Sequence, residues 1–185
     1  MTGLFGGAFD PPHNGHVALA ETALEHFGLE RLLALVVVDP GHRDVVLDFP
    51  TRMRLADLAF AALPRTEVLS EEHRYTVDSV RSGRFGDAIF LVGADEFASF
   101  LSWKEPNGVL EEVRLGVATR PGFRAEALES ILQRLERPDR VEFFTIPQLP
   151  ISGTEVRERA ARGEPVDELV PPAVAAEIDR LGLYR

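Results

Sequence analysis

Cysteine is absent from this sequence of 185 residues. Its absence excludes disulfide bonds and every reaction that depends on a thiolate. A chain without disulfides fits a reducing compartment, so we expect a cytoplasmic protein.

Long apolar runs are also missing. The longest one, Leu32–Val38, has the length of a β-strand, whereas a helix needs about 20 apolar residues to cross a bilayer. The sequence does not begin with the basic and then apolar segments of a secretory leader. We therefore expect no association with a membrane.

Positive charge is scarce. The 20 basic residues, of which Lys104 alone is a lysine, accompany 30 acidic residues and leave a net charge of −10. A general DNA or RNA binder would carry a basic surface, so we expect no nucleic-acid partner. A small anionic ligand is compatible with this charge, because a local pocket can be positive on an acidic protein.

What the sequence does contain is an alternation of strand-like and helix-like segments. Strands are predicted at Thr2–Phe5, Leu32–Val38, Glu67–Leu69, Ala88–Val92, Leu115–Thr119 and Val141–Ile146. Helices are predicted at Val17–Phe27, Arg52–Leu63, Thr76–Ser82, Phe97–Trp103, Val109–Val113, Glu126–Leu135, Thr154–Arg162 and Ala173–Leu181.

This alternation indicates an α/β fold. We expect a single Rossmann-like, doubly wound parallel sheet with helices on both faces and a small helical C-terminal end. Ligands bind such sheets at the carboxyl ends of the strands, where the strand order switches. No repeat or linker interrupts the pattern, so residues 1–185 are interpreted as one domain, with Asp39–Phe49 as an irregular loop.

A glycine-histidine turn follows the first predicted strand. It contains the pair Gly6-Gly7 and then His13-Asn14-Gly15-His16, where Asn14 can cap a helix that starts at Gly15. Backbone without Cβ atoms, free N–H groups and the helix dipole favour a phosphate in such a turn. A structural turn is an equally good interpretation. A metal site is less favoured, because Asp10 and His13 lack further ligands at suitable spacing.

A second anion-site pattern lies near the C-terminus. Ser152-x-x-Glu155 is a capping box that predicts a helix starting just after Ser152. Arg157 lies one turn inside this helix, and its side chain can lean back toward an anion held by the N–H groups of Gly153 and Thr154. The alternative is a well-capped surface helix with no ligand.

Weaker signals accompany these two motifs. Gly93 and Asp95 follow a buried strand and suit a ribose or a base, although Asp95 could serve only as a helix N-cap. Trp103 is the sole tryptophan and is either a core residue or a stacking partner. His42-Arg43 lies in the irregular loop, and this basic pair either contacts a phosphate or is solvated.

Together these motifs resemble the nucleotidyltransferase superfamily marked by H-x-G-H, here His13-Asn14-Gly15-His16. The superfamily motif I-S-x-T-x-x-R corresponds to Ile151–Arg157. Within the superfamily the chain is most similar to the bacterial nicotinate-mononucleotide adenylyltransferases. Further supporting stretches, in family order, are Gly6–His13, His42-Arg43, Tyr75–Ser79, Gly93–Asp95, Trp103-Lys104 and Arg120–Gly122.

Three positions depart from the family pattern. Ala8 replaces the usual Thr or Ser, and Gly153 replaces a usual Ser, so two hydroxyl groups are missing. Arg43 stands where Lys is common, which keeps the charge and changes its geometry.

The resemblance implies that the phosphate of nicotinate mononucleotide attacks the α-phosphorus of ATP, giving nicotinate adenine dinucleotide and pyrophosphate. It implies catalytic roles for His16 at the α-phosphate, His13 at the triphosphate and Arg157 at the leaving pyrophosphate. The implied ATP-binding residues are Gly6, Gly7, Ala8, Phe9, His13, His16, Gly93, Asp95, Ser152, Gly153, Thr154 and Arg157. The implied mononucleotide-binding residues are Arg43, Thr76 and Trp103.

The resemblance also implies a Mg²⁺ ion that arrives with ATP, and no metal ligands from the protein. Four alternatives stay open: transfer to nicotinamide mononucleotide, transfer to phosphopantetheine, cytidylyl transfer, and a regulator that binds nucleotides without catalysis. The family pattern for phosphopantetheine enzymes has Thr where this chain has His13. The sequence also leaves open whether the chain forms a homo-oligomer.

Overall fold

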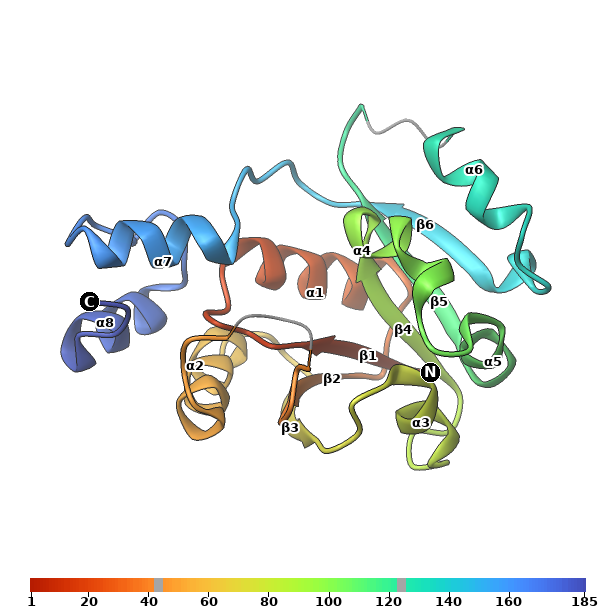
Figure 1. The fold of residues 1–185 in the computed structure, drawn as a ribbon, viewed down its shortest axis with the longest axis horizontal. Coiled ribbons are helices and arrows are strands. Elements are labelled where there is room, and N and C mark those ends of the chain that lie inside the picture. The colour runs from red at the N-terminus through yellow and green to blue at the C-terminus, as the bar shows by residue number, and fades with distance from the viewer. Residues whose placement is uncertain (42–44, 123–125) are drawn as a thin grey trace.

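The fold is built around one six-stranded sheet (Figure 1). The computed structural model describes residues 1–41, 45–122 and 126–185, without the side chains of residues 126 and 127. The order of the strands is β3-β2-β1-β4-β5-β6, and every neighbouring pair is parallel. The strands are β1 (Thr2–Gly7), β2 (Arg31–Val37), β3 (Thr66–Glu71), β4 (Ala88–Gly93), β5 (Arg114–Thr119) and β6 (Val141–Thr145).

The strand order switches direction at β1. The chain proceeds outward from β1 through β2 to β3, and then crosses back to place β4 on the other side of β1. Leu4 of β1 accordingly pairs with Leu33 of β2 on one side and with Phe90 of β4 on the other. Such a switch opens a crevice beyond the carboxyl ends of the two strands, and the end of β1 carries the glycine-histidine turn.

Helices cover both faces of the sheet, as predicted. On one face, the buried core includes residues of α1 (Asn14–His26), α2 (Phe49–Phe60), α7 (Gly153–Ala161) and α8 (Pro172–Leu181). On the other face, it includes residues of α3 (Thr76–Arg81), α4 (Ala94–Ala98), α5 (Pro106–Glu112) and α6 (Glu126–Leu132). Alternating residues of β2 divide between the two cores, with Leu32 in the first and Leu33 in the second, because strand side chains alternate in direction. Figure 1 shows α7 and α8 together at one end of the molecule.

Several predicted helices begin or end a few residues away from their predicted bounds, and one is split. The helix predicted at Arg52–Leu63 begins earlier, at Phe49, because Asp48 accepts a hydrogen bond from the Thr51 N–H and Pro50 occupies the first turn. The helix predicted at Phe97–Trp103 is split into α4 and a 3₁₀ turn at Phe100–Ser102, with Ser99 between them. Within the described residues, no helix is long and apolar enough to cross a membrane.

Candidate active site

A cavity of about 910 Å³ lies at the carboxyl ends of β1 and β4, at the upper end of the roughly 300–1,000 Å³ typical of ligand pockets. Segments far apart in the sequence line it. The predicted ligands among its lining residues are Gly6, Gly7, Ala8, Phe9, His13, His16, Thr76, Gly93, Asp95, Trp103, Gly153, Thr154 and Arg157. The predicted contact Arg43 and its neighbour His42 lie outside the described residues.

The glycine-histidine turn enters α1 one residue earlier than predicted. His13, in extended conformation, is the N-cap, and Asn14 is the first helical residue. The Asn14 backbone N–H donates to Leu169 O at 2.9 Å, and its side-chain amide donates to Glu168 O at 3.2 Å. The segment between α7 and α8 therefore occupies part of the N-terminus of α1. This corrects the role predicted for Asn14, and it leaves the histidine side chains as the main groups that α1 presents to the cavity.

The two histidine rings of the turn are stacked, with centroids 3.7 Å apart and planes inclined by 21°. The His13 backbone N–H donates to His16 Nδ1 at 3.1 Å. Because Nδ1 is an acceptor, Nε2 carries the hydrogen of the neutral His16 ring. A Cβ at Gly15 would lie 3.1 Å from both Cε1 and Nδ1 of His13. The glycine of the motif thus makes room for the first histidine.

His13 is held in its neutral form. Its pKa is lowered to about 4, chiefly by burial and also by the charge of Arg120, while a backbone hydrogen bond opposes the shift. Among described residues, its Nδ1 is the one buried side-chain nitrogen or oxygen that lacks a hydrogen-bond partner. An unpaired buried polar atom is rare in folded proteins and is common where a ligand completes the site. The ring of His13 is therefore neutral near pH 7, with its Nδ1 open to a hydrogen bond.

We expect the ring of His13 to stay neutral down to about pH 5. The fold favours the deprotonated ring, so His13 contributes stability above its unfolded pKa of about 6.5. That contribution is lost as the pH falls toward the folded value of about 4. An NMR titration of the ring carbons measures this, with His13→Gln identifying the signal. A titration step near pH 6.5 would contradict the assignment.

Arg157 brings the C-terminal motif to the same place. Its Nη1 donates to the carbonyl oxygen of Asp10 at 2.8 Å, across 147 residues of sequence, and its Nη2 donates to Thr154 Oγ1 at 3.1 Å. The guanidinium therefore leans back over the first turn of α7, as predicted. Helix geometry leaves the N–H groups of Gly153 and Thr154 without intrahelical partners. Together they form a cationic group of donors that lines the same cavity as the two histidines.

Ser152 and Gly153 have structural roles in this arrangement. The Ser152 hydroxyl accepts the Glu155 N–H at 3.2 Å, so it caps α7, and among the described residues Ser152 is the predicted ATP contact that does not line the cavity. A Cβ at Gly153 would lie 3.3 Å from Arg157 Nη1. A serine there would require a small shift of the guanidinium, so Gly153 leaves room for this position of Arg157.

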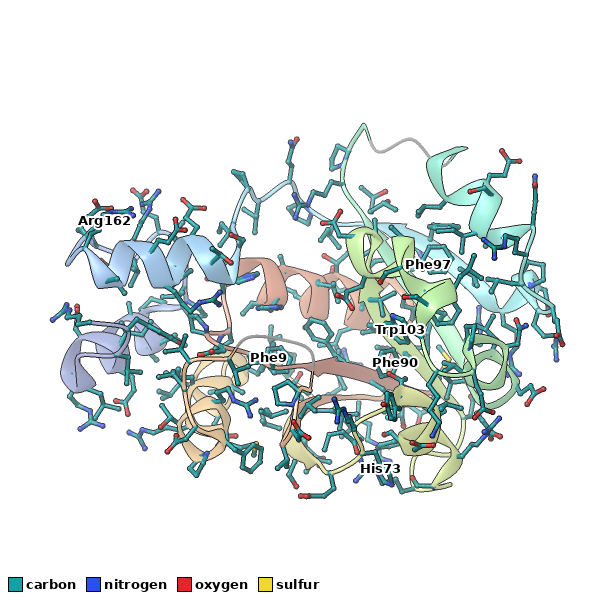
Figure 2. All side chains as sticks on the ribbon, in the orientation of Figure 1. Phe9, His73, Phe90, Phe97, Trp103 and Arg162 are labelled. Carbon is teal, nitrogen blue, oxygen red and sulfur yellow. The ribbon has the colours of Figure 1, made fainter. Side chains whose placement is uncertain are left out.

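The opposite wall of the cavity is aromatic and charged. Figure 2 shows Phe90 and Trp103 beside one another, and their rings meet edge to face at 6.2 Å. The Lys104 ammonium donates to both carboxylate oxygens of Asp78 at 2.9 Å and lies 5.0 Å from the centre of the Tyr75 ring. Gly93 is the N-cap of α4 and Asp95 lies exposed in its first turn. The alternative role of Asp95 as an N-cap is thereby wrong.

Metal ligands do not gather at this cavity. In residues 1–41, 45–122 and 126–185, no three His, Cys, Asp or Glu side chains are grouped so that they could hold a metal ion.

Comparison with known proteins identifies the family of this chain. The model of the cytidylyltransferase-like family matches residues 4–159, which span both the histidine and the Arg157 motifs. The chain belongs to the cytidylyltransferase-like family. The resemblance expected from its motifs, to nicotinate-mononucleotide adenylyltransferases within this superfamily, is confirmed by its curated relatives.

Two of these relatives illustrate the similarity. Proteins of Thermomicrobium roseum and Thermus thermophilus, both described as probable nicotinate-nucleotide adenylyltransferases, are 37% and 36% identical to this family member. The alignments cover 99% of this chain, and 91% and 98% of the two relatives. A solved structure of the Plasmodium falciparum nicotinic acid mononucleotide adenylyltransferase complexed with NaAD has a TM-score of 0.81 at 17% identity, covering 99% of this chain and 96% of that one. At this identity the structural similarity concerns the fold.

Sequence reasoning missed one buried residue of this family member. Arg52 of α2 is 1% exposed. It donates to four backbone carbonyls, those of Ala8, Val37, Val38 and Leu47, at 2.9 to 3.3 Å. It therefore ties the ends of β1 and β2 together beneath the cavity, and it holds Ala8 by the backbone. A charged residue in a helical pattern looks like a solvated one, so the sequence alone carries no signal of this role.

Proposed function

We propose that this protein transfers the adenylyl group of ATP to nicotinate mononucleotide, forming nicotinate adenine dinucleotide and pyrophosphate. The observation that carries the proposal is the convergence of His13, His16 and Arg157 on one cavity, with Arg157 hydrogen-bonded to Asp10 at the head of the histidine turn. The family membership and the names of the relatives support the same reaction.

The reaction needs positioning and charge stabilisation from the protein. A phosphate oxygen of the mononucleotide forms a bond to the α-phosphorus of ATP, and the bond from that phosphorus to the bridging oxygen of pyrophosphate breaks in line with it. The bonding electrons leave with pyrophosphate. Because the nucleophile is already an anion, no residue has to remove a proton from it.

Each motif supports one part of this step. The Nε2–H of His16 would donate to the α-phosphate, where charge builds in the transition state. Neutral His13 would form a hydrogen bond to the triphosphate. Arg157 and the N–H groups of Gly153 and Thr154 would hold the β- and γ-phosphates and stabilise the leaving pyrophosphate.

The remaining assignments follow from the walls of the cavity. The backbone from Gly6 to Phe9, with Gly93 and Asp95, would lie against the adenosine half. Thr76 and Trp103 would contact the pyridine nucleotide. A Mg²⁺ ion would be held by phosphate oxygens and water, and when bound it neutralises part of the phosphate charge.

The setting of the reaction is part of the proposal. Residues 1–185 would act as one nucleotidyltransferase domain, since α7 and α8 share a buried core with β1, α1 and α2. We place the reaction in the cytoplasm, because both substrates are intracellular nucleotides.

The deciding experiment is an assay of pyrophosphate release from ATP with three acceptors in parallel. We expect release with nicotinate mononucleotide, and its dinucleotide product should appear by chromatography in equal amount. Faster turnover with nicotinamide mononucleotide or with phosphopantetheine would replace the proposed acceptor. CTP in place of ATP tests cytidylyl transfer. ATP binding without release for any acceptor would overturn catalysis in favour of a regulatory role.

A further inference from the structure

The carboxyl-terminal end of the chain reaches the histidine turn through Asp10. The Asp10 side chain is buried, with 7% of the residue exposed. Its Oδ1 accepts the hydroxyl hydrogen of Tyr184 at 2.7 Å, across 174 residues of sequence. Its Oδ2 accepts the N–H of Val46, and its backbone carbonyl accepts Arg157. Asp10 is thus the point where the C-terminal segment, the loop before α2 and the phosphate-binding arginine meet.

Tyr184 is held in place by more than this one hydrogen bond. It follows α8, which ends at Leu181 with Gly182 as its C-cap, and its own backbone lies in the left-handed region at φ 68°. A non-glycine residue keeps that conformation only where its surroundings enforce it. Glu177 of α8 pairs with Arg54 of α2 and fixes the helix against the body of the protein. Figure 1 shows α8 beside α2.

The protonation state of Tyr184 matches a fixed hydrogen bond. Partial burial and the nearby Asp10 carboxylate both raise the pKa of Tyr184 above its usual range, so its hydroxyl remains a donor. Buried Arg52, which binds the carbonyls of neighbouring segments, supplies positive charge near Asp10. The carboxylate therefore stays in a defined position, with its oxygens directed to Tyr184 and Val46.

We propose that Tyr184 is a positioning residue for adenylyl transfer: its hydroxyl fixes Asp10, and the Asp10 carbonyl in turn orients the Arg157 guanidinium toward the triphosphate. The proposal rests on the proposed function in that Arg157 binds the phosphates of ATP. Tyr184 is not among the residues that line the cavity, so it acts on the substrate through other residues. Loss of its hydroxyl should weaken the ATP side of the site and spare the mononucleotide side.

Tyr184→Phe tests this by removing one oxygen atom. The hydrogen bond to Asp10 is present before ATP binds, so its loss acts on binding through the position of Arg157. We expect the affinity for α,β-methylene-ATP, measured by calorimetry, and the kcat/KM for ATP each to fall about tenfold. The KM for nicotinate mononucleotide should stay within about twofold of wild type. If Tyr184 had a purely structural role, the variant would have a lower melting temperature, and ATP and mononucleotide parameters would change alike. That result would overturn the proposal.

Arg185→Gln is the matched control. It removes a 2.7 Å hydrogen bond from the next residue to Asp179, on the same terminal segment and without a link to Asp10. We expect it to bind the ATP analogue as wild type does. An equal loss in this variant would mean that any disturbance of the C-terminus weakens the site, and would also overturn a specific role for Tyr184.

A double-mutant cycle separates action through Arg157 from action elsewhere. If Tyr184 acts through Arg157, adding Tyr184→Phe to Arg157→Ala should cause little further loss of analogue affinity. If the affinity losses of the two single variants multiply in the double variant, the proposed route through Arg157 is overturned.

The binding measurement needs no acceptor, so it also distinguishes this proposal from the proposed function. A wild-type protein that binds the analogue but makes no dinucleotide would refute the proposed function and leave the positioning test intact. A wild-type protein that does not bind the analogue would refute both.

Discussion

The His16→Ala variant is expected to lose about 10²–10³-fold in kcat, with a KM for ATP within a few-fold of wild type. The reason is that Nε2–H meets a charge that develops in the transition state and is weaker in bound ATP. His13 N–H fixes the His16 ring through Nδ1, so the donor is held in place before substrate arrives. Steady-state kinetics of dinucleotide formation measure the effect.

A histidine at the other end of the same helix provides the control. His26 lies in the last turn of α1, where it pairs with Glu142 at 3.5 Å, and it does not line the cavity. His26→Ala should therefore keep its kcat. If His16→Ala retained a kcat near wild type, or if the whole loss fell on the KM for ATP, His16 would not have the transition-state role assigned to it.

The Arg157→Ala variant is expected to lose about 10²-fold in kcat/KM for ATP, while the KM for the mononucleotide changes little. Charge-assisted hydrogen bonds to phosphate are worth about 1.5–3 kcal/mol each, and the guanidinium offers two arms. Because Arg157 Nη1 also donates to the carbonyl oxygen of Asp10, the variant loses the hydrogen bond that ties α7 to the histidine turn. The kcat/KM of Arg157→Lys for ATP should lie between those of wild type and Arg157→Ala, because lysine keeps the charge and loses the planar guanidinium.

Arg159→Ala on the same helix is the control for Arg157. Arg159 forms an i,i+4 ion pair with Glu155 at 2.9 Å, which is a surface interaction of small value, and it is outside the cavity lining. Its kinetics should resemble those of wild type. Equal weakening of ATP and mononucleotide by Arg157→Ala would show that the arginine supports the whole cavity rather than the triphosphate.

Local patterns were enough to predict most of the sheet. The continuous apolar run at Leu32–Val38 predicts a strand buried on both faces, and β2 lies in the interior of the sheet between β1 and β3. Helix boundaries were less accurate where capping chemistry competed with hydrophobic spacing. Asp48 and Pro50 start α2 three residues before the predicted Arg52, and His13 rather than Asn14 caps α1.

The sequence by itself determined the α/β fold class and the two motifs of this protein: two histidines after the first strand and a capped arginine helix near the end. The tertiary structure alone decided how these parts are held. Arg157 bonds the Asp10 carbonyl, Tyr184 bonds the Asp10 carboxylate, and Arg52 ties the strand ends below them. The physical reason is distance along the chain. Hydrophobic periodicity and capping act over a few residues, whereas the Arg157 and Tyr184 contacts span 147 and 174 residues and form only when the sheet brings their segments together.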